Sequence, residues 1–180
     1  MDLTNILGAL TSNDAASTIA KNLNLDSNQV SSVITAALPS LLGAMQKNAS
    51  SQAGAASLAD ALGYHAGNAG NIVNNLKTAD LTDGNKILSH IFGGNLGNVL
   101  GGISKSTGVG SNAVGSILAS IAPSLLALLG KGQQSSGTNA AGLESMLGMI
   151  LGGMTSSQSG SNAGGLGSIL GGLGSILGKK

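Results

Sequence analysis

The sequence predicts an all-α protein, and three observations support that fold class. Apolar residues make up 42% of the 180 residues and recur at the three- and four-residue spacing of a helix face. Val, Ile and Thr never alternate with polar residues over the length of a strand. A segment near the N-terminus also returns about 84 residues later. We therefore expect a body at 1–132, with related units at about 1–48 and 87–132 joined by helical residues 55–86, and a Gly/Ser/Leu-rich tail at 133–180.

The repeat is visible when residues 21–48 are aligned with residues 105–132. Ten of the 28 aligned positions are identical. Both copies contain the sequence Pro-Ser-Leu-Leu, which begins at Pro39 and at Pro123. Two copies are too few for a solenoid, which usually needs three or more. A duplicated helical unit packed on itself is the simpler interpretation.

Each copy contains one long amphipathic helix. Asp26 or Ser27 can cap the first helix by accepting hydrogen bonds from free backbone N–H groups, and Ser111 opens the second helix. Pro39 and Pro123 each remove one backbone hydrogen bond, so they either kink the helix or split it. The apolar stripe keeps its phase across each proline, which favours a kink. The two stripes consist of Val30, Val33, Ile34, Ala37, Leu38, Leu41, Leu42 and Met45, and of Val114, Ile117, Leu118, Ile121, Leu125, Leu128 and Leu129.

Shorter helices fill the rest of the chain. They are expected at about 2–10, 14–23, 56–63, 68–77, 84–92 and 96–106, and in the tail at 141–152 and 164–178. The candidate starts are Asn13, Ser57, Thr82 or Asp83, and Asn95, and the candidate stops are Gly63, Gly67, Gly70, Gly84 and the pair Gly93-Gly94. The Ser/Gly/Gln-rich intervals 133–139 and 155–162 are expected to be flexible linkers.

Composition excludes several classes of function. The chain has no Cys, so disulfides, thiolate metal sites and Cys nucleophiles are absent. Tyr64 and Phe92 are the two aromatic residues in a chain without Trp, too few for a platform that stacks bases or sugars. Eight Lys against seven acidic residues give a net charge of +1, which implies no polyanionic partner.

The low charge content also bears on solubility and location. Charged residues make up 8% of the chain, whereas a soluble surface normally carries roughly a quarter of its residues as charges. Copies of such a surface repel each other weakly, so self-association is expected. No basic leader is visible, and the longest strongly apolar stretch, residues 117–129, is 13 residues against the about 20 that span a bilayer. The default expectation is cytoplasmic, although a non-classical export route would leave the same sequence.

Residues 19–34 resemble a helix-turn-helix. Ala20 would lie at the helix crossing, Asn24 would take the left-handed turn, and residues 27–32 would face the major groove. DNA binding rests on neutralising phosphates with Lys and Arg, yet residues 27–33 contain no basic side chain. An ordinary packing corner is therefore the preferred interpretation, and DNA binding is an alternative.

No catalytic or metal site emerges from the sequence. His65 and His90 are the two histidines, and neither lies in a nucleophile elbow or a cluster of metal ligands. The glycines at 93–97 lack the preceding strand and the Gly-Lys-Ser/Thr of a phosphate loop, so they are expected to form a loop and close packing. We therefore predict no enzyme, no cofactor and no small-molecule substrate.

The tail contains a direct repeat. Residues 165–171, Gly-Leu-Gly-Ser-Ile-Leu-Gly, recur without change at 172–178 and are followed by Lys179 and Lys180. As a helix, the repeat gathers its apolar residues on one face with a seven-residue period. Six Gly in 14 residues cost about 1 kcal/mol each relative to Ala, so this helix needs a partner surface. The residues predicted to mediate self-association are Leu166, Ile169, Leu170, Leu173, Ile176 and Leu177.

Three possibilities stay open for the tail: an unstructured segment, docking on the same or another copy, and contact with a lipid surface. A further piece at residues 143–151 is similar to the repeat. Its Met146 and Met149, with Met154 just beyond, are adaptable apolar fillers.

Three separated motifs resemble the YidB-like family of bacterial proteins. They are the pattern Leu23-Asn24-Leu25, Val30-Ser31, Leu38-Pro39 and Leu42, its twin Thr107-Gly108-Val109, Val114, Ala122-Pro123 and Leu126, and the segment 83–94, Asp-Gly-Asn-Lys-Ile-Leu-Ser-His-Ile-Phe-Gly-Gly. The resemblance covers about residues 1–132 and implies an all-helical fold and a bacterial source. The family is a domain of unknown function, so no catalytic residue is carried over.

Together these observations predict a non-enzymatic structural protein that self-assembles into a homo-oligomer or filament through its low-charge helical surfaces and its tail. The first alternative is a protein that associates with membranes through the Gly/Leu tail. The second is a DNA-binding helix-turn-helix module.

Overall fold

The computed structural model describes residues 8, 10–68, 70 and 72–158. This part of the chain is helical and contains no strand, so the predicted all-α fold class is confirmed. The helices are α2 (Asn13–Leu23), α3 (Ser27–Ala49), α4 (Gln52–Ala66), α5 (Ile72–Lys77), α6 (Leu81–Phe92), α7 (Leu96–Thr107), α8 (Ser111–Ser136) and α9 (Leu143–Gln158), with 3-10 turns at Gly93–Asn95 and Ala140–Gly142.

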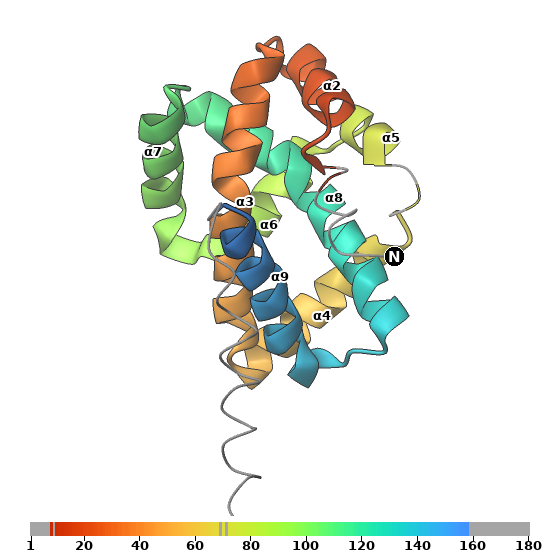
Figure 1. Ribbon diagram of the computed structural model, residues 1–180. Helices are drawn as coiled ribbons and strands as arrows, with labels where there is room; N and C mark the ends of the chain where they lie inside the picture. Colours follow the sequence, from red (N-terminus) through yellow and green to blue (C-terminus); the bar gives the residue numbers. More distant parts are fainter. Residues whose placement is uncertain (1–7, 9, 69, 71, 159–180) are drawn as a thin grey trace, which may run out of the picture.

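Helix α8 runs through the middle of the bundle (Figure 1). Helices α4 and α6 pack on it, α7 and α3 also contact it, and α2 and α5 lie together at one end. Helix α9 lies along α3. By length and hydropathy α8 could cross a bilayer, yet 78% of its most apolar 18-residue window is buried inside the fold. Burial of that kind is typical of the core helix of a globular protein.

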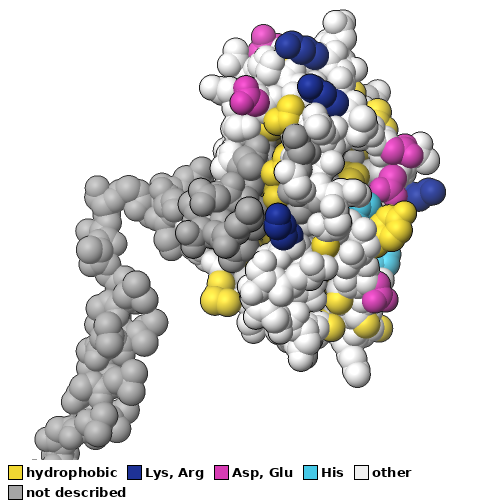
Figure 2. Space-filling view, turned by 90° about the vertical axis from the view of Figure 1, so that its right-hand side faces the viewer, with side chains coloured by type: hydrophobic (Ala, Val, Ile, Leu, Met, Phe, Trp, Pro, Cys, Tyr) yellow, Lys and Arg dark blue, Asp and Glu magenta, His cyan; other side chains and the backbone are white. Residues whose placement is uncertain are grey.

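The outside of the bundle carries few charges. Figure 2 shows lysines and acidic side chains scattered over a surface that is mostly neither charged nor apolar. Among the described residues, Tyr64 and Met149 are the large apolar side chains that stand out into solvent, with 82% and 70% of their surface exposed. The surface therefore offers little electrostatic repulsion between copies.

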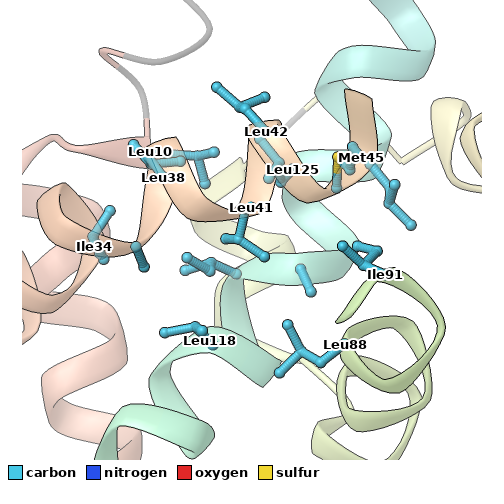
Figure 3. Close-up of a cluster of buried hydrophobic side chains, with 14 of the residues drawn as sticks. Leu10, Ile34, Leu38, Leu41, Leu42, Met45, Leu88, Ile91, Leu118 and Leu125 are labelled. Carbon is cyan, nitrogen blue, oxygen red and sulfur yellow. The ribbon is translucent and has the colours of Figure 1, made fainter. Parts of the chain in front are cut away.

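The inside is built from aliphatic side chains. One continuous cluster joins Leu10 with residues of every helix from α2 to α9. Figure 3 shows part of it, where α3, α6 and α8 meet. The side chains at this centre are fully buried in α3 (Leu41 and Leu42) and in α8 (Leu118 and Leu125). Leu88 of α6, which is 1% exposed, packs beside them. The apolar stripes predicted for the two long helices all lie in this core.

The two repeated segments have matching local geometry. Helices α3 and α8 begin at Ser27 and Ser111, which are 84 positions apart in the sequence. The helix that precedes each one ends at a left-handed residue, Asn24 with φ 54° and Gly108 with φ 73°. The expected left-handed turn at Asn24 is thus present. Both helices continue through their prolines, so neither is split in two, and the kink stays a prediction.

Two helices begin earlier than the sequence suggested. The predicted start of α4 at Ser57 is wrong because the Ser51 side chain accepts from the Gly54 N–H and begins the helix there. The predicted start of α6 at Thr82 or Asp83 is wrong because Asp80 is the cap.

The glycines Gly63 and Gly84 were expected to end helices, but both lie inside them. Gly84 has a tertiary reason. A Cβ there would lie 1.9 Å from the Ala119 carbonyl oxygen of α8, so α6 can approach α8 only with glycine at this position. Gly130 of α8 allows the same close approach of α4, since a Cβ there would lie 2.2 Å from the Leu62 carbonyl oxygen.

The predicted linkers are partly helical. Residues 133–136 belong to α8, which ends at Gly137 with φ 62°, and residues 155–158 belong to α9. Polar composition alone does not end a helix, and no residue before Gly137 breaks α8. Residues 159–162 lie outside the described residues.

The expected boundary between body and tail falls inside the fold. Position 132 lies within α8, and the helix expected at 141–152 is found as α9, whose Leu143, Met146 and Leu147 belong to the common core. The helix expected at 164–178 lies outside the described residues. The part of the tail up to α9 is therefore packed on the body.

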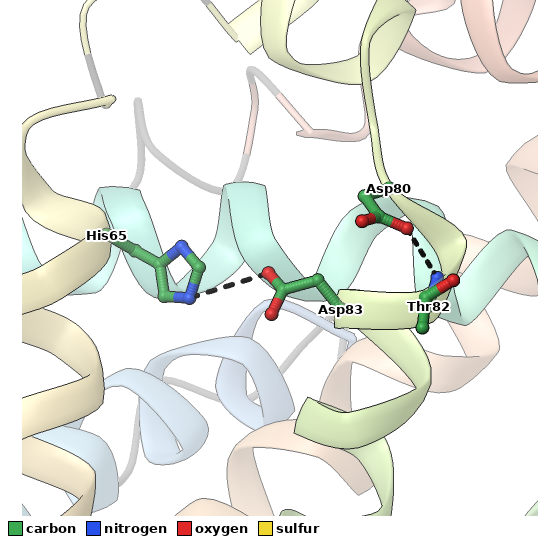
Figure 4. Close-up of polar contacts among 4 residues, drawn as sticks. All are labelled: His65, Asp80, Thr82 and Asp83. Carbon is green, nitrogen blue, oxygen red and sulfur yellow. Dashed lines mark hydrogen bonds and ion pairs between the residues drawn. The ribbon is translucent and has the colours of Figure 1, made fainter.

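Helix α6 begins with a charged cap (Figure 4). The Thr82 backbone N–H donates to Asp80 Oδ1 at 2.8 Å, and this bond lowers the pKa of the Asp80 carboxyl below its usual value. Desolvation acts in the opposite direction but is weaker, and the charge of Lys86 adds to the lowering. The ionised form of Asp80 thus stabilises the start of the helix.

The close approach at Gly84 gives a first prediction. Gly84→Ala should lower the free energy of unfolding by about 1–3 kcal/mol, because its Cβ collides with the α8 backbone and forces the helices apart. Gly102→Ala is the matched control, since Gly102 is exposed in α7 with open space around its Cβ position. That change should stabilise the protein by up to about 1 kcal/mol through helix propensity. Urea denaturation measures both, and equal midpoints for Gly84→Ala and the unchanged chain would refute the close-approach argument.

The Asp80 cap gives a prediction about pH. Because the folded-state pKa is depressed, the charged cap adds stability above the unfolded pKa of about 3.9, and this stability is lost as the pH falls through the folded pKa. Asp80→Asn keeps a capping oxygen but does not titrate. The melting temperature of the unchanged chain should exceed that of Asp80→Asn near pH 7, and the difference should shrink below pH about 4. A difference that is constant with pH would contradict this assignment.

Candidate functional site: the face of α3 that binds α9

The six tail residues predicted to mediate self-association lie outside the described residues. A related segment is described, however, because α9 contains the piece that is similar to the tail. The way α9 packs on α3 therefore shows how a Gly/Leu-rich helix of this chain finds a partner surface.

Helix α9 packs antiparallel to the C-terminal half of α3. Leu151 lies beside Gly43, with its Cδ2 4.0 Å from the position of a Gly43 Cβ. One turn earlier in α9, a Cβ at Gly148 would lie 2.9 Å from Gln46 Nε2. Because the residue numbers rise along α3 while they fall along α9, the two helices run in opposite directions. Glycine on each helix lets the other helix come close.

The apolar side of α9 is buried against the body. Leu147 is fully buried, Met146 and Ile150 are 4% and 5% exposed, and Leu143 is fully buried at the start of the helix. Leu151 is partly buried at the edge of the contact. The opposite side faces water, as the 70% exposure of Met149 shows.

A seven-residue motif of this docked helix occurs three times in the chain, with one or two substitutions. Residues 147–153 read Leu-Gly-Met-Ile-Leu-Gly-Gly, residues 166–172 read Leu-Gly-Ser-Ile-Leu-Gly-Gly, and residues 173–179 read Leu-Gly-Ser-Ile-Leu-Gly-Lys. The first and second copies differ at one position, and that position is Met149, the exposed one. The buried Leu147 and Ile150, the partly buried Leu151, and Gly148 thus have identical counterparts in the second and third copies.

Sequence reasoning noticed that the two segments are similar but missed this register. An alignment of residues 147–153 with residues 166–172 would have found it from the sequence alone. What the sequence lacks is the direction of each side chain, and only the packing on α3 shows that the variable position faces solvent.

The copies differ upstream of the shared motif. In α9 the buried residues Leu143 and Met146 precede it. At the same distance before the second copy stand Asn162 and Gly165, and before the third copy stand Ile169 and Gly172. The third copy therefore keeps four of the five apolar positions of α9, and lacks the equivalent of Met146.

The corner between α2 and α3 forms the helix-turn-helix arrangement expected from the sequence. Asp26 caps α3 by accepting from the backbone N–H groups of Asn28 and Gln29. The first turns of α3 expose Ser27, Asn28 and Gln29, none of them basic. This surface has no cation with which to bind phosphate, so it fits a packing corner better than a DNA-reading helix.

The histidines lie between α4 and α6. Ser57 Oγ and His90 Nε2 are 3.0 Å apart, and His65 Nε2 lies 3.8 Å from Asp83 Oδ2 (Figure 4). These are two separate contacts. The Ser57 hydroxyl contacts the imidazole of His90, whereas the Asp83 carboxylate faces the imidazole of His65, so the three groups do not form a Ser-His-Asp relay. Each contact joins α4 to α6, which is a structural role.

A shallow groove of about 440 Å³ runs beside His90, lined by residues of α3, α6 and α7 that include Lys47 and Asn48. Asn48 is engaged in a structural hydrogen bond, in which its Nδ2 donates to the Ile91 carbonyl at 2.8 Å. Within the described residues, no three His, Asp or Glu side chains come together as a metal site would require.

Comparison with known proteins identifies one family. A family model described as bacterial protein of unknown function (DUF937) matches residues 5–132, and the YidB-like family is the same family. No curated protein and no solved structure gives a significant match. The matched segment covers most of the chain and includes both repeated units and the helices between them. The chain therefore belongs to this bacterial family of unknown function.

Proposed function

We propose that the protein is a non-enzymatic, self-assembling structural protein in which the Gly/Leu repeats of the tail link one copy to another. The observation that carries the proposal is that the tail repeats the sequence of α9, a helix that packs on the body through that sequence. A segment with such a face needs a surface to cover it, because its glycines make it unstable as an isolated helix.

The surface of the body supports the same proposal. Charges are few and of both signs, with a net charge of +1, so copies can approach each other without strong repulsion. The duplicated unit adds a rigid, buried framework to which the tail is attached. The polar contacts of His65 and His90 join α4 to α6, which supports a structural role for both residues.

Membrane association through the tail is the alternative that the test must distinguish from self-assembly. Helices that lie on lipid usually carry a basic polar face, whereas Lys179 and Lys180 are the only cations after Lys131. The polar positions of the repeat are Ser and Gly, which suits contact with protein better than contact with anionic lipid.

The test replaces Leu170 and Leu177 by Asp in the full chain and measures the mass in solution by sedimentation. Burying an Asp in an apolar contact is costly, so the double variant should shift from large species to smaller ones. Ser168→Asp/Ser175→Asp is the matched control, because it adds the same charges at positions that are equivalent to the exposed Met149. This control should keep most of the assembly.

Two results would contradict the proposal. If the unchanged chain sediments as a monomer at all concentrations, there is no self-assembly. If Leu170→Asp/Leu177→Asp keeps its mass but no longer co-sediments with vesicles of anionic phospholipid, the tail acts on membranes instead.

A further inference from the structure

We infer that the last repeat of the tail, residues 169–178, binds the α9-binding face of α3 in a second copy of this chain and takes the place of α9 there. The inference rests on the proposed self-assembly and names the surface that the tail uses. It follows from the structure of the α3–α9 contact and from the positions at which the tail matches α9.

The match covers the residues that make the contact. Ile169, Leu173, Ile176 and Leu177 stand at the positions of Leu143, Leu147, Ile150 and Leu151, all of which pack on the core in α9. Gly174 stands at the position of Gly148, where a Cβ would lie 2.9 Å from Gln46 Nε2 and the Gln46 side chain would have to shift. Ser175 stands at the position of the exposed Met149. A helix formed by this segment thus presents to α3 the same surface as α9.

One difference decides where the segment binds. Gly172 replaces the buried Met146, so the tail repeat makes a weaker contact than α9 on the face that both fit. In its own chain α9 is also the nearer segment, since it directly follows α8 and Ala140–Gly142. Within one chain α9 therefore keeps the face, and its own tail is left to bind elsewhere.

Between copies, exchange leaves no face uncovered. Each chain has one such face on α3 but three copies of the motif, so motifs outnumber faces. Because α9 makes the stronger contact, the tail of one copy takes the face of a second copy only at high protein concentration, and the displaced α9, which carries the same motif, can then bind a third copy. Such a contact is heterologous, because different surfaces of the two copies meet, and it builds rings or filaments.

Cross-linking can test the register, because the chain has no native Cys. Gln46→Cys/Gly148→Cys within one chain serves as the positive control and selects a reagent that joins these two positions when α9 is docked. Chains with Gln46→Cys are then mixed with chains with Gly174→Cys. We expect joined dimers containing one chain of each kind. Ser175→Cys, the neighbour that would face solvent, should give several-fold less of this product.

A second variant tests the competition. Met146→Ala removes a buried contact of α9 but leaves the tail unchanged, so it should move assembly to a protein concentration lower by roughly tenfold or more. Met149→Ala, at the exposed position of the same helix, should leave the midpoint unchanged. Combining Met146→Ala with Leu170→Asp/Leu177→Asp should remove the gain, which distinguishes exchange from aggregation of a loosened core.

The outcomes separate this inference from the proposed function. If assembly depends on Leu170 and Leu177 but Gly174→Cys and Ser175→Cys cross-link equally, the tail mediates assembly through another surface and this inference fails alone. If the Gln46→Cys/Gly174→Cys chain cross-links within itself and no mixed dimers form, the tail binds its own copy and the inference is overturned. A chain that never assembles overturns both.

Discussion

The close contact of α8 with α4 and α6 is the constraint on which the rest of the fold depends. Helix α8 is buried on nearly all sides, and two helices reach its backbone only because glycine stands at Gly84 of α6 and at Gly130 of α8. These contacts hold both α4 and α6 against α8. The pairs Ser57–His90 and His65–Asp83 then join the two helices across their shared border.

The two repeated helices have related sequences but different neighbours, and a few substitutions explain the difference. At the position where α8 has Gly130 and meets α4, α3 has Gln46, which lies against Gly148 of α9. Where α8 has the buried Ala119, α3 has the exposed Thr35. The long helix with the smaller and more apolar side chains at these positions lies at the centre of the bundle, and α9 covers one side of the other long helix.

That flank connects the fold to the proposed function. A helix rich in Gly and Leu has little stability by itself, but it packs closely where a partner offers small residues and an apolar face. The body supplies such a face on α3, which α9 covers, and the tail repeats the α9 motif in its sequence. Because the rest of the surface has few charges, association between copies meets little electrostatic resistance.

The sequence by itself determined the all-α class, the left-handed turn at Asn24, the apolar stripes and the family, because each depends on local periodicity or on a continuous motif. It also contained the three copies of the α9 motif. Only the tertiary structure decided that Gly84 lies within a helix and that Met149 faces solvent. A glycine has the same local preferences at a helix end and at a helix crossing, and the backbone of another helix, distant in sequence, decides between the two.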